Sequence, residues 1–271
     1  MQHIALLTDL SADSLHAARY AIKLFGTERT RYTAVHAYMD AYVGDAMIPM
    51  PAMAPELVGI AEEGLRIWAK QLQEGASQLM LEQRLVIGGP VKAARDVGHD
   101  ANAEMVVVGR SGKGGSAFFG SSAVDVMKRS RVPVLVVPKG TPIERPTTIL
   151  LADDHEEIQA GELAPLRALA ITTGASIVIA HVEMEVPEGS AHWSDNIYEL
   201  ALADVPHTFL SAPGTDVADG LLRLAKKEHA QLVAMLHRHL DLLARLLHPS
   251  TTKDVLLHVD KPLLVLQQVE A

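Results

Sequence analysis

Short apolar runs alternate with longer amphipathic segments along the chain. A continuous apolar run bounded by turn residues is typical of a strand buried on both faces, whereas apolar residues every three to four positions indicate a helix. In the first half, this spacing predicts helices over residues 14–25, 55–81, 91–102 and 121–130. Ser11 or Asp13 is placed to cap the first helix. Such alternation favours right-handed crossovers and a parallel, doubly wound sheet.

Four landmarks of the first half recur in the same order in the second half. Residues 5–9, 33–37, 103–108 and 132–137 resemble residues 149–153, 178–182, 230–235 and 261–266. This pairing matches Asp9 with Asp153 and His36 with His181. The repeat predicts two tandem α/β domains, 1–143 and 144–271, each with a mainly parallel five-stranded sheet. Their seam lies in the proline- and glycine-containing stretch 139–146.

Composition narrows the class of protein. Apolar residues make up 48% of the chain and aromatic residues only 4%, so the cores must be aliphatic. The absence of cysteine excludes disulfides and thiol chemistry. A net charge of −9 without a long basic run argues against nucleic-acid binding. Because neither a signal peptide nor an apolar run of roughly 20 residues is visible, we expect a cytoplasmic protein that does not contact membranes.

Residues 106–122 carry the most informative motif. A buried apolar run leads into a glycine-rich loop, and a helical pattern begins at its far end. Glycines let backbone N–H groups approach an anion, and a helix start adds free N–H groups and a positive dipole end. The loop is neither a Walker loop nor a dinucleotide fingerprint, which would follow the first strand. A glycine-rich loop by itself is more often a mobile turn than a ligand site, but its place between a buried strand and a helix start leaves both interpretations equally open.

The loop resembles the universal stress protein signature Gly-x2-Gly-x9-Gly-Ser/Thr. The first strand with Thr8-Asp9, the second with Val35-His36-Ala37 and the closing run 132–137 are also similar to that family. The resemblance covers nearly the whole chain, twice. It implies a Rossmann-like fold that binds ATP or another adenine nucleotide, with or without Mg²⁺.

The resemblance also implies site residues in the first domain. Asp9 and Ala37 would flank the adenine, Val108 and Gly109 would line the base and ribose edge, and Thr8 would also contribute to nucleotide binding. The phosphates would meet Gly112, Gly120, Ser121 and Ser122. Asp9 fits a second interpretation equally well, as a helix-capping residue. The loop departs from the family pattern, since seven residues rather than nine separate Gly112 from Gly120.

The second domain lacks the equivalent glycines. Leu236, His239 and Pro249 stand where the first domain has Gly109, Gly112 and Gly120. Their side chains would obstruct a phosphate, and proline lacks an N–H donor. We therefore predict that the second domain does not bind ATP and that residues 236–248 serve in packing or docking.

Several features leave alternatives open. His237, His239 and His248 suit either a metal site or ordinary surface positions, and the acidic run 153–157 suits either metal binding or a solvated helix start. The methionine-rich stretch 39–53 is a lid, a contact with another chain or a surface loop. No catalytic constellation and no metal-ligand pattern is evident.

The sequence thus predicts a stress-response or signalling protein. The alternatives are a slow ATPase and a nucleotide-independent interaction protein. The closing strands 132–137 and 262–267 would pair, either within one chain as a pseudo-dimer or between chains in a homodimer. A further protein partner is expected, but its identity is unknown.

Overall fold

The structure is a computed structural model that describes residues 2–38, 55–76, 78–100, 102–110, 121–154, 156–183, 195–239 and 261–267. The elements of the first domain are β1 (Gln2–Thr8), α1 (Ala12–Phe25), β2 (Thr30–Tyr38), α2 (Pro55–Gln73), β3 (Met80–Ile87), α3 (Pro90–His99), β4 (Met105–Gly109), α4 (Ser121–Arg129) and β5 (Val134–Val137). Those of the second are β6 (Thr148–Ala152), α5 (Ala160–Thr173), β7 (Ser176–Glu183), α6 (Asp195–Ala201), β8 (His207–Pro213), α7 (Val217–Lys227), β9 (Leu232–Leu236), the 3₁₀ turn η1 (His237–His239) and β10 (Leu263–Leu266).

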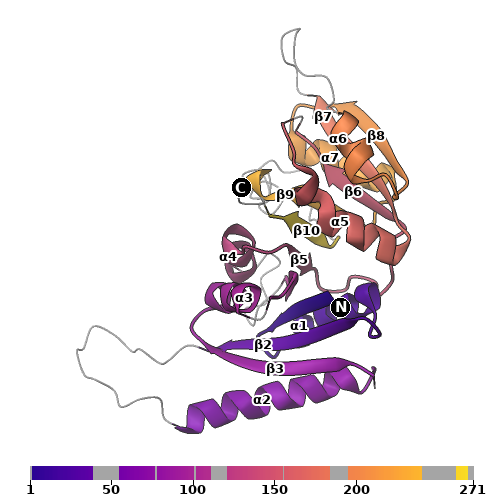
Figure 1. The fold of residues 1–271 in the computed structure, drawn as a ribbon. Helices are drawn as coiled ribbons and strands as arrows, with labels where there is room; N and C mark the ends of the chain where they lie inside the picture. Colours follow the sequence, from indigo (N-terminus) through magenta and orange to yellow (C-terminus); the bar gives the residue numbers. More distant parts are fainter. Residues whose placement is uncertain are drawn as a thin grey trace, which may run out of the picture.

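The described strands form one ten-stranded sheet in the order β3-β2-β1-β4-β5-β10-β9-β6-β7-β8 (Figure 1). Pairing is parallel within each half, which confirms the doubly wound fold. At the centre β5 and β10 pair in antiparallel fashion, with Leu264 opposite Leu135. The closing strands therefore meet within one chain, as the pseudo-dimer interpretation predicted.

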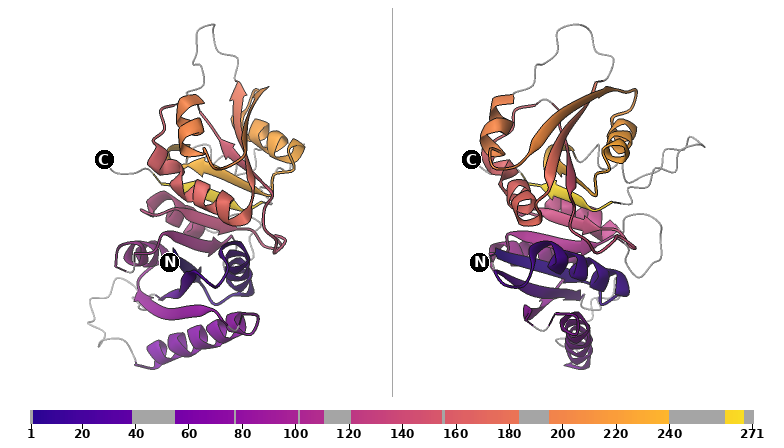
Figure 2. Two further views of the ribbon diagram at one scale, coloured as in Figure 1. Left: turned by 45° about the vertical axis from the view of Figure 1, so that its right-hand side comes forward. Right: turned by 90° about the vertical axis from the view of Figure 1, so that its right-hand side faces the viewer.

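Two hydrophobic cores cover the two faces of this sheet, and each core runs through both domains. Successive residues of a strand point to opposite faces, so Ile4 and Leu6 lie in one core and Ala5 and Leu7 in the other. Helices α1, α2, α5 and α6 cover the first face, and α3, α4 and α7 cover the second (Figure 2). The strands are buried on both sides, as the continuous apolar runs predicted.

One predicted helix is wrong at its end. Residues 55–81 do not form a single helix, because α2 stops at Gln73 and β3 starts at Met80. Strand β3 is an edge strand with mixed exposure, so its sequence lacks the apolar run of the central strands. The other three predicted helices are confirmed within a few residues, and Ser11 is the N-cap of α1. None of the described helices is long and apolar enough to cross a bilayer.

The shared core generates a stability prediction. Leu264 is fully buried beside Leu135, in the core common to both domains. We expect Leu264→Ala to lower the free energy of unfolding by about 2–5 kcal/mol, because it removes buried methyl groups and leaves a cavity. Calorimetry should show a single transition at lower temperature.

The control is Leu200→Ala in α6, where the leucine is 73% exposed. That change should alter the free energy of unfolding by less than about 0.5 kcal/mol. Two separate transitions, with only the second-domain transition lowered in Leu264→Ala, would contradict the shared core.

Candidate functional site

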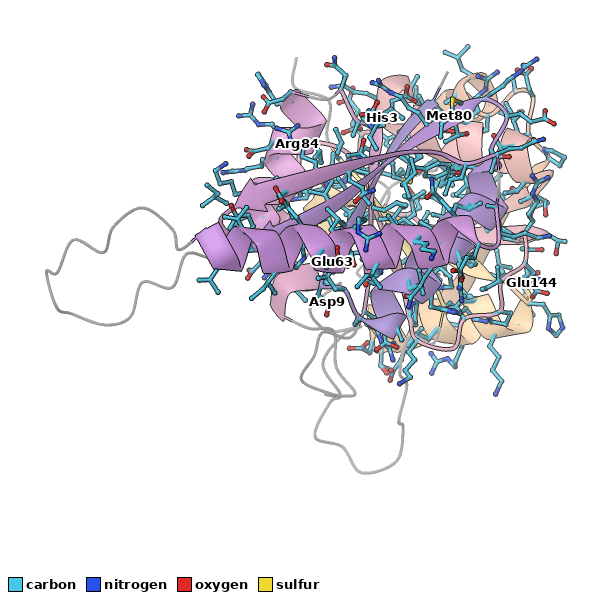
Figure 3. All side chains as sticks on the ribbon, turned by 90° about the horizontal axis from the view of Figure 1, so that it is seen from below. His3, Asp9, Glu63, Met80, Arg84 and Glu144 are labelled. Atoms are coloured by element: carbon cyan, nitrogen blue, oxygen red, sulfur yellow. The ribbon has the colours of Figure 1, made fainter. Side chains whose placement is uncertain are left out.

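The carboxyl ends of β1, β2 and β4 lie at one edge of the sheet. Because these strands are parallel neighbours, Thr8 and Asp9, Ala37, and Val108 with Gly109 come to that edge together. Asp9 and His3 lie at opposite ends of β1 (Figure 3). In an open parallel sheet, the carboxyl edge beside a change of strand order is where ligands bind. The structure thus brings together the described residues of the predicted site.

Side chains of its own residues build the turn between β1 and α1. Thr8 is buried, and its hydroxyl accepts the Leu10 N–H at 2.8 Å and lies 2.8 Å from the Ser14 hydroxyl. The Ser11 hydroxyl accepts the Ser14 N–H at 3.2 Å, and Asp9 Oδ1 accepts the Ser11 N–H at 3.0 Å. Ser11 rather than Asp9 is therefore the N-cap of α1. Asp9 stabilises the turn that precedes the helix, through the hydrogen bond from the Ser11 N–H.

The second carboxylate oxygen of Asp9 is the distinctive atom of this edge. Asp9 Oδ2 is buried and has no hydrogen-bond partner among the described residues. A buried carboxylate oxygen without a partner costs on the order of 1–3 kcal/mol or more. This atom is a hydrogen-bond acceptor that no described donor satisfies.

Leu10 holds this turn in an unusual conformation. Its φ of 65° lies in the left-handed region, which leucine rarely adopts. Its side chain extends to α2, where a Cβ on Gly64 would come within 2.7 Å of Leu10 Cδ1. Gly64 thus makes room for Leu10. Strained backbone of this kind is concentrated at functional sites.

A histidine links the ends of β1 and β2. His36 Nδ1 donates to the Thr8 carbonyl oxygen at 2.8 Å, since a carbonyl can only accept. In the second domain, His181 Nδ1 makes the same bond to the Asp153 carbonyl oxygen at 3.0 Å. The two histidines are in register, as predicted, but their structural role had no signal in the sequence beyond the repeat itself.

These two histidine bonds correct the residue-by-residue matching of the two domains at the end of the first strand. His36 and His181 match Thr8 with Asp153, so Asp9 corresponds to Asp154 and not to Asp153. The strand register agrees, because Ile4 pairs with Met105 as Ile149 pairs with Leu232. The sequence pairing of Asp9 with Asp153 was wrong by one residue.

Gly109 lies where β4 meets the first turn of α1. A Cβ at this position would approach the Asp13 carbonyl oxygen at 3.2 Å and the Ser14 nitrogen at 3.3 Å, both of which are backbone atoms. The glycine therefore permits close packing of helix on strand at the edge of the site. The sequence had explained Gly109 only as a residue lining the base and ribose.

The predicted phosphate-binding residues are described only in part. Gly112 and Gly120 lie outside the described residues, as does the methionine-rich stretch 39–53. Ser121 and Ser122 are the first two residues of α4. Because α4 returns the chain from the carboxyl end of β4 to the start of β5, its amino-terminal end lies at the same edge as Asp9.

The acidic run of the second domain is not a solvated helix start. Asp153 is buried and accepts a hydrogen bond from the Tyr198 hydroxyl, whose pKa is raised by burial and by the charge and hydrogen bond of Asp153. Asp154 forms an ion pair with Arg238. Helix α5 begins only at Ala160, where Gln159 and Glu162 form a capping box.

Arg238 is the residue that sequence reasoning missed at this second edge. Burial lowers the pKa of its guanidinium, but the hydrogen bond and charge of Asp154, together with the charges of Glu156 and Glu162, outweigh burial, so that the pKa is raised overall. The described residues contain no group of three acidic or histidine side chains arranged to hold a metal ion. His237 instead bonds the Lys128 carbonyl oxygen at 3.0 Å, while His248 lies outside the described residues.

Comparison with solved structures places this architecture among known proteins. A universal stress protein from Archaeoglobus fulgidus DSM 4304 is 19% identical, with a TM-score of 0.68 over 98% of this chain and 96% of that one. A functionally unknown protein from Pseudomonas aeruginosa PAO1 is 13% identical, with a TM-score of 0.54 over 98% and 92%. At these identities the likeness establishes the fold alone. A search of curated proteins found no significant match.

The family comparison is more specific. The model of the universal stress protein family matches the chain twice, over residues 1–138 and 147–267. The two matches cover most of the chain and fall on the two halves of the ten-stranded sheet. The protein therefore belongs to the universal stress protein family, as a tandem member with two copies of the domain.

Proposed function

We propose that the first domain binds ATP or another adenine nucleotide and that the protein acts in stress response or signalling through this binding. The observation that carries the proposal is the buried Asp9 Oδ2, which lacks a partner among the described residues at the carboxyl edge of the sheet. An adenine amine or a ribose hydroxyl is a donor of the required kind. The other oxygen of Asp9 is held by the Ser11 N–H, which fixes the carboxylate in place.

The amino-terminal end of α4 supports the phosphate part of the proposal. Helix α4 starts at Ser121, at the edge that holds Asp9. Free N–H groups and the helix dipole favour an anion there. The glycines at 112 and 120 precede this start in the sequence, in the spacing of a shortened family loop. A nucleotide would thus have its base near β1 and its phosphates near α4.

The second domain differs in both parts of this site. The carboxylate equivalent to Asp9 is that of Asp154, and Arg238 already neutralises it. Leucine, histidine and proline replace the three glycines. We therefore propose that the second domain has a structural or docking role and that one chain binds one nucleotide.

The first test replaces the proposed acceptor. Asp9→Asn keeps an oxygen for the Ser11 N–H but presents an NH₂ group where Asp9 presents Oδ2. We expect the dissociation constant for ATP to rise about 10- to 100-fold, because a charged acceptor is lost and two donors face each other. Isothermal titration calorimetry measures this change.

The control for Asp9→Asn is Asp13→Asn, in the first turn of α1. It removes the same charge close by, without altering the Asp9 carboxylate. Its affinity for ATP should stay within a few-fold of that of the unsubstituted protein. Equal weakening by both substitutions would mean that Asp9 contributes only to the general electrostatic field.

The second test concerns the glycines and the stoichiometry. Gly112→Leu combined with Gly120→Pro copies the second domain into the first and should abolish ATP binding without changing the thermal unfolding transition. The unsubstituted protein should bind one ATP per chain. A stoichiometry of two, or binding that survives the double substitution, would show that the site lies elsewhere.

Two further measurements separate this function from its alternatives. If calorimetry detects no binding of any adenine nucleotide, the protein is a nucleotide-independent interaction protein. If purified protein turns over ATP, and Asp9→Asn lowers that rate together with affinity, the same site belongs to a slow ATPase.

A further inference from the structure

The guanidinium of Arg238 fills a receptor formed by the turn between β6 and α5. Its Nε donates to Asp154 Oδ2 at 3.0 Å and its Nη2 to Asp154 Oδ1 at 2.8 Å, so the pair is bidentate. Nη1 donates to the Glu157 carbonyl oxygen at 2.8 Å, and Nη2 lies 3.3 Å from that of Glu156. The Asp154 carboxylate and two carbonyls thus surround a single planar cation, and the Glu156 carboxylate lies 3.7 Å from its Nε.

This receptor is the counterpart of the turn that holds Asp9. The register of the strands and the two histidine bonds match Asp154 with Asp9. Arg238 comes two residues after the end of β9, as residue 111 comes two residues after the end of β4. In the first domain Asp9 Oδ2 has no partner among the described residues, whereas in the second domain both oxygens of Asp154 accept from one side chain.

We propose that Arg238 is a built-in ligand of the second domain, whose guanidinium occupies the position that in the first domain faces Asp9 Oδ2. The turn after β6 is accordingly a binding site for a guanidinium group, and the chain supplies the occupant itself. The comparison of Arg238 with a bound ligand rests on the proposed nucleotide binding by the first domain. The guanidinium site formed by Asp154 and the carbonyls does not depend on that proposal. The second domain is therefore permanently occupied and does not respond to a nucleotide.

The occupant also fixes a contact between the domains. Arg238 belongs to η1, whose His237 bonds the Lys128 carbonyl oxygen in the last turn of α4. Gln267, which follows β10, donates to the neighbouring Met127 carbonyl oxygen at 3.3 Å. Holding Arg238 thus holds η1 against the carboxyl-terminal end of α4. The opposite end of this helix lies at the edge of the first-domain site.

The burial of the pair distinguishes it from an ordinary surface ion pair. The side chains of Arg238 and Asp154 are 15% and 29% exposed, whereas those of Arg66 and Glu63 on α2 are 61% and 53% exposed. Arg66 also contacts its carboxylate through two nitrogens, at 2.7 and 2.6 Å. The two pairs have the same chemistry in different surroundings, and exposed pairs contribute little to stability. Arg66→Ala is therefore a matched control.

The test is chemical rescue, read out by thermal unfolding of the full chain. Arg238→Ala should lower the melting temperature by about 5–10 °C, because it leaves a partly buried carboxylate without its cation. Arg66→Ala should lower it by about 2 °C or less. Millimolar methylguanidinium should restore part of the loss in Arg238→Ala, saturably, while sodium chloride at the same concentration should not.

The double variant Arg238→Ala with Asp154→Asn identifies the receptor. It should show no rescue by methylguanidinium, and the unsubstituted protein should show none either, since its receptor is full. Equal melting temperatures for Arg238→Ala and Arg66→Ala, or rescue that persists in the double variant, would overturn the proposal. These readouts do not involve ATP, so a failure of nucleotide binding in the first domain leaves them interpretable.

Discussion

The antiparallel pairing of β5 with β10 determines how the two domains are placed relative to each other. Each domain alone would leave a short, fully apolar strand at the edge of its sheet. The unpaired backbone groups of such a strand can pair with another chain and cause aggregation. Pairing the two edges inside one chain removes both and makes the cores continuous on the two faces. Because the pairing is antiparallel, the strands of the two domains run in opposite directions. The carboxyl ends of the strands of the two domains, and hence Asp9 and Asp154, therefore lie at opposite edges of the sheet along the strand direction.

This arrangement gives α4 a position between the two sites. The amino-terminal end of the helix lies at the edge of the first-domain site, and its carboxyl-terminal end meets η1 at the edge of the second. The degenerate loop of the second domain, predicted to serve in packing or docking, thus begins in contact with the first domain. A packed helix transmits a displacement from one end to the other more readily than a loop does, because interiors are close-packed.

The sequence predicted the architecture well because the evidence lay in a repeat. Landmarks as far apart as Pro133 and Pro262 recur in equivalent places, and each proline carbonyl bonds the strand before it, at Val106 and Val233. The error of one residue at Asp9 has a physical origin. A strand buried on both faces has no alternation of polar and apolar residues, so its sequence does not fix the register. Hydrogen bonds from His36 and His181 were needed to set it.

The candidate site was predictable from the sequence only where it is built from local features, such as strand ends and glycines. Strand ends and glycines mark the candidate site of the first domain, and the close packing of Gly109 against α1 was not predicted from the sequence. Arg238 could not be predicted, because its partner lies 84 residues away and its neighbours resemble any basic surface turn. Long-range ion pairs leave no periodic signal in a sequence.

The two domains satisfy the same requirement in different ways. Each places a carboxylate just beyond a buried strand, where burying an ionised group is unfavourable unless a donor faces it. In the second domain the chain provides a donor that cannot dissociate or lose its proton, since guanidinium stays charged at all physiological pH values. In the first domain, the donor for Asp9 Oδ2 does not come from the described residues. The second copy of the fold thus supplies its own cation, and that cation belongs to the 3₁₀ turn that contacts the carboxyl-terminal end of α4.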